Sequence, residues 1–121
     1  MIKTKSIHDP IEYSDGQRIL ISCYWPKFAT LKIVDLWLPE LGSDLELIKN
    51  WNGRKYDWDF FKNDYLIKLE SSKVEHILKR VAETAKESNV TLIGHARASN
   101  QCHRTLLKDY LDQHYIYSVQ R

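Results

Sequence analysis

Apolar residues along the chain form short strand-like runs and longer stretches with helical spacing. Three runs are typical of strands: Ile2 to Ile7, the apolar run of RILISCYW that begins at Ile19, and NVTLIG from Asn89 to Gly94. The second and third are apolar enough to be buried on both faces of a sheet. The first contains Lys3 and Lys5, and this polarity predicts a strand near the sheet edge.

Four stretches between the second and third strands have the spacing of helices. The first, LKIVDLWL, places Leu31, Val34 and Leu38 on one face and ends at Pro39. The second opens at a capping-box sequence, SDLE, at 43–46. Its apolar stripe consists of Leu47, Ile48 and Trp51.

The remaining helical stretches are more regular. The third helix has apolar residues at intervals of three, four and seven, and they are Trp58, Phe61, Tyr65, Leu66 and Leu69. A second capping-box sequence, SKVE at 72–75, opens the fourth helix, whose stripe runs to Ala85. A further helix is expected after Ser99 or Asn100 as its N-cap, with Leu106, Leu107, Tyr110 and Leu111 inward. HYIYSV at 114–119 alternates like a last strand.

Strands interleaved with helices predict one α/β domain over residues 1–121. We expect a three-layer, Rossmann-like architecture with a mainly parallel sheet flanked by helices. The connection after the first strand shows no helix and is barely long enough for a parallel crossover. The partner of the first strand is therefore left open.

Composition narrows the class of protein. Apolar residues make up 43 % and charged residues 28 %, as in globular proteins rather than disordered or membrane ones. A net charge of +2 is too small to indicate a nucleic-acid-binding protein. The N-terminus lacks the apolar core of a signal peptide, and no run is long enough for a membrane span. With only Cys23 and Cys102, a reduced cytoplasmic protein is expected.

Polar and reactive residues gather where two predicted strands end. One loop is Ser22 to Lys27, and the other begins with GHAR at 94–97 and leads to Cys102-His103-Arg104. Ligands of parallel sheets bind at the carboxyl ends of the strands. A helix N-terminus adds unpaired amides that favour an anion. A cysteine beside arginines there would be held more in its thiolate form.

The candidate site residues fall into two groups. Cys102 is the candidate nucleophile, and His103 or His95 is the candidate for proton transfer. The candidates for ligand contacts are Arg18, Trp25, Lys27, Arg97 and Arg104.

Each candidate at the helix start also has a structural interpretation. Cys102 aligns with Leu106 and Tyr110, which favours a buried thiol in the core. His103 aligns with Leu107 and Leu111, as an inward, hydrogen-bonded histidine would. For Arg104 the structural interpretation is a side chain that only faces solvent.

The aromatic residues around Lys27 allow two interpretations. Tyr24, Trp25 and Phe28 could stack on bases, but covering a sheet edge is the favoured role. The other tryptophans have helical spacing and are expected in the core; they are Trp37, Trp51 and Trp58. Lys3 and Lys5 are expected to be solvated charges.

Metal and cofactor signals are weak. Cys23, His95, Cys102 and His103 could hold zinc, but their spacing gives this little support. A disulfide between the two cysteines is disfavoured by the compartment. The sequence has no glycine-rich phosphate loop and no GxSxG, so no cofactor is expected.

Several segments in order resemble one known family. SIHDP, SDGQRILISCYWPK, DLWLPEL and NVTLIG are similar to those of the YeaO-like proteins, domain of unknown function 488. The segment QCHRTLL resembles the Cys-His-Arg motif of another branch of that superfamily. The resemblance spans almost the whole chain. It implies a compact α/β domain but no established reaction.

The chain departs from this family at one polar element. The family pattern has Asp-Arg before the aromatic-Trp-Pro element and Arg-Gly after it, where this chain has Ser22-Cys23 and Lys27-Phe28. The matching positions that remain are Arg18, Trp25 and Pro26, with Cys102, His103 and Arg104 carried from the other branch.

Three hypotheses follow. The leading one is a protein, enzyme or not, that binds a small anionic ligand such as a nucleotide or phosphate at the strand ends. The second is a binding module for nucleic acid or a protein that uses Tyr24, Trp25, Lys27 and Phe28. The third is a degenerate family member without activity. No membrane partner is expected, and the oligomeric state is left open.

Overall fold

Four strands of the chain pair in parallel in a single sheet. The structure, a computed structural model, describes residues 1–26, 32–43, 57–94 and 102–117. The strands are β1 (Ile2–Ser6), β2 (Gln17–Leu20), β3 (Leu36–Trp37) and β4 (Val90–Gly94), in the order β1-β4-β2-β3. The three strands expected from apolar runs are thus confirmed, and so is the three-layer, Rossmann-like α/β fold.

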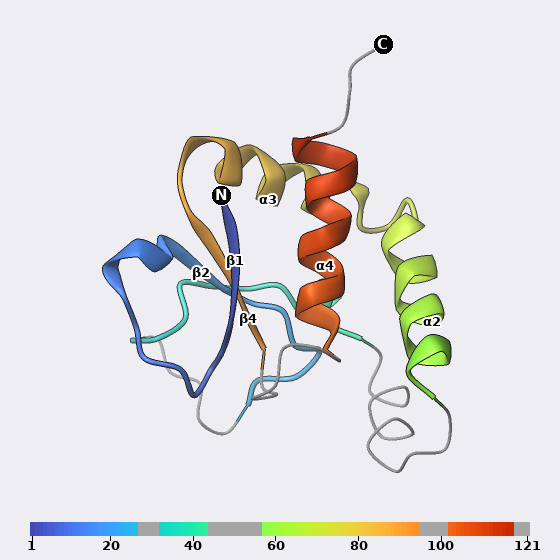
Figure 1. Cartoon of the computed structure of the whole chain (residues 1–121), viewed down its shortest axis with the longest axis horizontal. Coiled ribbons are helices and arrows are strands. Elements are labelled where there is room, and N and C mark those ends of the chain that lie inside the picture. Colours follow the sequence, from blue (N-terminus) through green and yellow to red (C-terminus); the bar gives the residue numbers. More distant parts are fainter. Residues whose placement is uncertain (27–31, 44–56, 95–101, 118–121) are drawn as a thin grey trace.

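Three described helices flank this sheet. They are α2 (Trp58–Glu70), α3 (Glu75–Glu87) and α4 (His103–Leu111), which continues into one π-helical turn (Asp112–Ile116). In Figure 1, α4 lies between β1 and α2, and α3 crosses the top of the view. No helix within the described ranges is long and apolar enough to cross a membrane.

Side-chain alternation along the strands divides the core in two. Ile19, Ile21 and Leu92 face the helices, where their main partners are Phe61, Tyr65, Leu69, Leu78, Leu107 and Leu111. The opposite face holds a smaller cluster of Ile7, Leu20, Val34 and Ile93. Because successive strand residues point to opposite faces, β2 and β4 each contribute to both clusters.

The first strand pairs with β4 rather than with β2, and it lies at the sheet edge as its polarity predicted. The chain from 7 to 16 therefore passes from β1 to β2 with no more than a short 3₁₀ turn, η1 (Tyr13–Asp15). Gly16 adopts φ +62° at the end of this turn, with the carbonyl of Asn89 where a Cβ would be. Only glycine fits that position without strain.

A buried ion-pair cluster fixes this short connection. Asp15 is almost fully buried, accepts from Lys3 Nζ at 3.3 Å and Lys5 Nζ at 2.8 Å, and also pairs with Arg18. Thr91 Oγ1 donates to the Asp15 carbonyl at 2.7 Å. The expectation that both lysines are solvated charges is wrong, since a buried carboxylate needs neighbouring cations.

The predicted LKIVDLWL helix is wrong. Residues 36–37 form the edge strand β3, because the backbone of this segment bonds to β2 instead of to itself. Asp35 N donates to Arg18 O at 2.9 Å, and Leu38 N donates to Leu20 O at 2.9 Å. Leu31 lies outside the described residues, as does the helix expected from 44 onward.

The third and fourth predicted helices are confirmed as α2 and α3, and their N-terminal ends differ in capping. Asp57 caps α2 by accepting from Phe60 N at 3.0 Å. The capping box expected at Ser72 is wrong, since α3 begins at Glu75 after Val74, which makes no side-chain cap. Ser72 instead lies in the turn that joins α2 to α3.

The expected last strand is also wrong. Residues 114–116 belong to the π-helical turn after α4, where Tyr115 and Ile116 pack against the core. The inward side chains of this segment are thus placed by helical winding, not by alternation. Residues 118 and 119 lie outside the described residues.

The tryptophans divide between core and edge. Trp58 packs against the core and stacks on Phe61 at 5.2 Å between ring centroids. Trp37 is 37 % exposed on edge strand β3, so its expected core position is wrong. The ring of Trp25 packs edge-on against Trp37 at 5.4 Å, in agreement with the favoured edge-covering role. Trp51 and Phe28 lie outside the described residues.

Candidate functional site

The end of β4 and the start of α4 lie together at the C-terminal edge of the sheet. β4 ends at Gly94, and α4 begins at His103 with Cys102 in the N-cap position. Cys102 has extended backbone angles and makes no side-chain cap. The expected N-cap at Ser99 or Asn100 is therefore wrong. As a result, His103 and Arg104 occupy the first turn of α4, where backbone amides have no intrahelical partner.

Arg104 is buried against the Cys102 thiol. The arginine is 1 % exposed, and its Nη1 donates to Cys102 Sγ at 3.4 Å. Both lie over Gly94, where a Cβ would come within 3.0 Å of Nη1 and 3.7 Å of Sγ. The solvent-facing interpretation of Arg104 is wrong. Cys102 is buried, at 5 % exposed, but a guanidinium lies within hydrogen-bonding distance of its sulfur.

His103 is held by the end of β2. Its Nε2 lies 2.5 Å from the carbonyl oxygen of Ile21, so Nε2 must carry the proton and donate. The ring also packs edge-on against Tyr65 at 5.6 Å. Burial lowers the pKa of His103 from 6.5 to about 4, and the charges of Arg104 and Lys68 act in the same direction. The Ile21 carbonyl opposes this shift without reversing it.

A neutral His103 has one ring nitrogen left to accept a proton. With Nε2 bonded to Ile21, the lone pair is on Nδ1, which lies 3.8 Å from Cys102 Sγ. The inward, hydrogen-bonded histidine weighed in the sequence is thus the observed one. Its inward position also brings an unprotonated ring nitrogen to within 3.8 Å of the thiol sulfur.

Helix α2 contributes two side chains that the sequence did not single out for a site. Tyr65 OH donates to the Leu41 carbonyl at 2.6 Å, and Lys68 Nζ donates to the Gly42 carbonyl at 2.5 Å. Burial raises the pKa of Tyr65 well above 10, and Cys102 adds to the rise. The only sequence signal was their spacing of three, which puts both on one helix face.

The segment these side chains hold packs closely on the end of β2. A Cβ on Gly42 would lie 2.4 Å from Cys23 N, so this contact requires glycine. Next to it, the Ser43 Oγ is buried and has no hydrogen-bond partner within the described part of the chain. Backbone from 41–43 and from 21–23 therefore forms one wall beside His103.

Cys23 and Cys102, both in the described part of the chain, are not joined in a disulfide. Among the described residues, no group of three or more His, Cys, Asp or Glu side chains is arranged to hold a metal ion. The zinc set proposed from the sequence includes His95, which lies outside those residues.

Arg18 lies away from the residues around Cys102. Its side chain points to the opposite face of the sheet from Ile19, donates from Nε to the Ile33 carbonyl at 2.7 Å and pairs with Asp15. The expected common site with Cys102 is therefore wrong for Arg18, because residues adjacent in a strand point to opposite faces. Trp25 packs on Trp37 instead. Lys27, His95 and Arg97 lie outside the described residues.

Comparison with known proteins identifies the family. A family model described as "Active DUF488-N3 subclade" matches residues 2–115. The chain is 36 % identical over 112 residues to "Uncharacterized protein YeaO" of Escherichia coli (strain K12), which covers 91 % of this chain and 96 % of that protein. No solved structure matches. The resemblance seen in the sequence is confirmed: the chain belongs to the YeaO-like DUF488 family.

Proposed function

We propose that the protein binds a small anionic ligand, a nucleotide or other phosphate, where α4 begins. The observation that supports this most is the contact between buried Arg104 and Cys102 Sγ, 3.4 Å apart, at the first turn of α4. A guanidinium and the unpaired amides of a helix N-terminus both favour an oxyanion. They lie at the carboxyl end of a parallel strand, where ligands of such sheets bind.

We further propose that Cys102 acts as a nucleophile on a bound phosphate ester: an S–P bond forms as the P–O bond to the leaving alcohol breaks, and the thiol proton goes to that alcohol. The guanidinium of Arg104 donates to the Cys102 sulfur, and His103 Nδ1 lies 3.8 Å from the same sulfur. Tyr65 and the Ile21 carbonyl hold the imidazole in that orientation. His95, Arg97 and Lys27 remain sequence-based candidates for the same site. Because Cys23 and Cys102 form no disulfide, we propose that the protein functions in a reducing compartment, the cytoplasm.

Calorimetric titration with AMP, ATP and inorganic phosphate tests the binding proposal. Wild-type protein should bind at least one of them, and Arg104→Met should reduce binding by roughly tenfold or more, since a charge-assisted contact is lost. Cys23→Ser is the control, because Cys23 is the other cysteine and is not part of the proposed site. Binding that is unchanged in folded Arg104→Met and His103→Ala proteins would contradict the proposal.

The binding-module hypothesis has its own observation. Tyr24, Trp25 and Trp37 are each at least partly exposed near edge strand β3. If this surface binds nucleic acid, affinity should fall steeply as salt is raised, whereas binding in a pocket should respond less. Trp25→Ala would weaken oligonucleotide binding in that case and leave the phosphate titration unchanged.

A further inference from the structure

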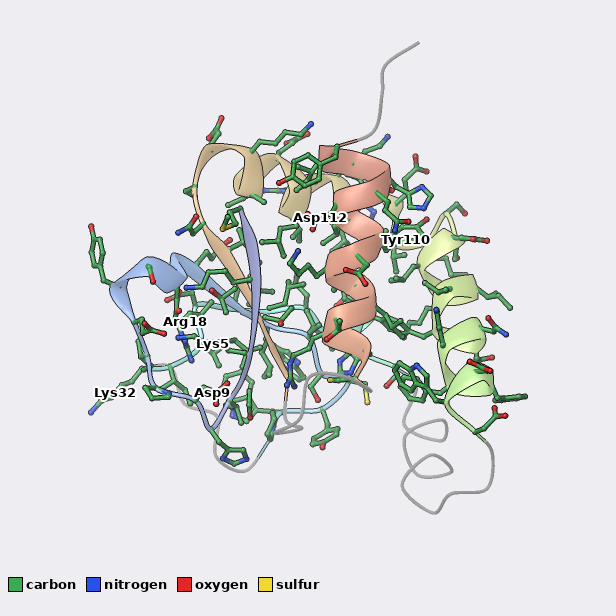
Figure 2. The ribbon with its side chains drawn as sticks, in the orientation of Figure 1. Lys5, Asp9, Arg18, Lys32, Tyr110 and Asp112 are labelled. Atoms are coloured by element: carbon green, nitrogen blue, oxygen red, sulfur yellow. The ribbon has the colours of Figure 1, made fainter. Side chains whose placement is uncertain are left out.

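We propose a second oxyanion site, at the opposite end of the sheet from the start of α4, in a cleft lined by Arg18 and Lys32. The cleft has a volume of about 560 Å³. Gly16 and Asn89, which immediately precede β2 and β4, are among its lining residues. It therefore lies where these strands begin, whereas Cys102 lies beyond the point where they end. Figure 2 shows Arg18, Lys5 and Lys32 at the left of the view, away from Tyr110 and Asp112 on the α4 side.

The guanidinium of Arg18 is fixed but incompletely bonded. Its Nε donates to the Ile33 carbonyl at 2.7 Å, and its Nη1 donates to Asp15. The residue is only 4 % exposed, and no acceptor in the described chain bonds its Nη2. A buried N–H without an acceptor is costly, and in native proteins such groups are satisfied by water or a ligand. Arg18 thus presents a positioned donor that lacks an acceptor.

The acidic side chains of the cleft have other partners. Glu12 Oε1 accepts from Lys5 Nζ at 2.6 Å, and Asp35 Oδ2 accepts from the Arg18 backbone N–H at 2.8 Å. Glu12 is therefore paired with a cation, and one oxygen of Asp35 is occupied by a backbone N–H. Lys32 adds a second positive charge to the lining. A small molecule that carries a carboxylate or a phosphate fits this arrangement, with one oxygen toward Arg18.

Tyr13 extends the cleft with an aromatic surface. It lines the cleft, and its side chain is fully exposed. An exposed ring at the rim can stack on a planar part of a ligand. This predicts that an oxyanion with an aromatic group binds better than the bare ion.

Anion titration followed by amide chemical shifts tests this site separately from the one at Cys102. The probes are acetate, inorganic phosphate, benzoate and AMP, at low ionic strength. Saturable shifts of Gly16 and of the Asn89 side-chain amide report the cleft, and shifts of His103 and Arg104 report the α4 site. Comparing acetate with phosphate distinguishes the two oxyanions. Benzoate should bind more tightly than acetate, and equal affinity would contradict the role of Tyr13.

Variants make the assignment specific. Arg18→Lys keeps the charge near Asp15 but lacks Nη2, and it should abolish the shifts at Gly16. Lys32→Gln should weaken binding roughly three- to fivefold, as expected for one exposed charge. Lys73→Gln, an exposed lysine before α3, is the matched control and should change nothing.

Two results would overturn the site. One is the absence of saturable shifts at Gly16 with every probe, and the other is unchanged binding in the Lys32→Gln and Arg18→Lys proteins. If Arg18→Lys does not fold, Lys32→Gln and Tyr13→Ala decide, since both residues are exposed. Cys102→Ser should leave the shifts at Gly16 intact, so failure of one site is distinguishable from failure of the other.

Discussion

One buried arginine lies toward each end of the sheet, and their partners differ. At the N-terminal ends of β2 and β4, Arg18 pairs with a buried carboxylate, Asp15, which also accepts from Lys3 and Lys5. At the C-terminal end, Arg104 donates to a thiol, Cys102, beside a neutral histidine. Removing one partner of a buried arginine–carboxylate pair leaves the other charge uncompensated and destabilises the fold. Arg104 instead donates to the side chain proposed as a nucleophile.

The difference also concerns what each cluster holds in place. The Asp15 cluster fixes the connection between β1 and β2, which contains only a short 3₁₀ turn and no α-helix. Ion pairs and hydrogen bonds, rather than apolar packing of a helix, hold this connection against the sheet. The Cys102 cluster lies on a helix already anchored by Leu107 and Leu111. We therefore expect substitutions at Asp15 to affect stability, and substitutions at Cys102 to affect chemistry.

The largest expected effect is that of Asp15→Asn. It leaves Lys5 and Arg18 without their buried counter-ion, and removing one partner of a buried pair costs roughly 3 kcal/mol or more. Urea unfolding gives the free energy of unfolding for wild type and variant. Glu12→Gln is the control, since Glu12 is exposed and should matter far less. If Asp15→Asn lowered the free energy of unfolding less than Cys102→Ala did, the proposed difference between the two clusters would be wrong.

The pH dependence of stability should separate the two ends. Burial keeps the folded-state pKa of His103 at about 4, against 6.5 ordinarily, so the unfolded state takes up the proton first as pH falls. The free energy of unfolding should then fall by roughly 2 kcal/mol between pH 6.5 and pH 4. His103→Gln should remove this loss, whereas exposed His76→Gln should retain it. A loss that persists in a folded His103→Gln protein would argue against a neutral His103.

Asp15 should act in a lower pH range. Its three cationic neighbours and a backbone N–H outweigh the opposing effect of burial and hold the pKa of its carboxyl well below 3.8. The stability that Asp15 contributes is therefore present above that pH and is lost as pH falls below it. The free energy of unfolding should depend less on pH in Asp15→Asn than in wild type, and only in this acid range.

Gly94→Ala should sharpen the description of the Cys102 end. The new methyl would lie 3.0 Å from Arg104 Nη1 and 3.2 Å from its Cδ, so the arginine must move. Overpacking of this kind costs about 1–3 kcal/mol. Ligand binding should weaken together with stability. A variant with wild-type stability and binding would show that the contact over Gly94 is not needed.

The smallest effect is expected on thiol reactivity. In a Cys23→Ser background, Arg104→Met should slow alkylation of Cys102 by iodoacetamide several-fold at neutral pH, because the sulfur loses the charged group that donates to it. Simple loosening of the structure would expose the thiol and speed the reaction instead. The sign of the change therefore separates the electrostatic role from a structural one. Thermal unfolding of the same variant serves as the control.

The sequence predicted much of the fold because the signals were local. The apolar runs of β2 and β4 and the helical periodicity of α2 and α3 lie within single segments, and each formed as expected. The site was predicted less well. Cys102 and His103 do lie at a strand end, but Arg18 faces the other side of the sheet, and Tyr65, Lys68 and Ser43 were not anticipated.

By itself the sequence determined the α/β class, the family and most element positions, because periodicity and motifs need only neighbouring residues. Tertiary structure decided the pairing of β1 with β4, the strand at 36–37, and the inward position of Arg104. Each of these depends on a contact between residues far apart in the chain, such as Leu38 with Leu20 or Arg104 over Gly94. Such contacts leave no periodic signal, since the partner's identity is set only when the sheet and helices pack together.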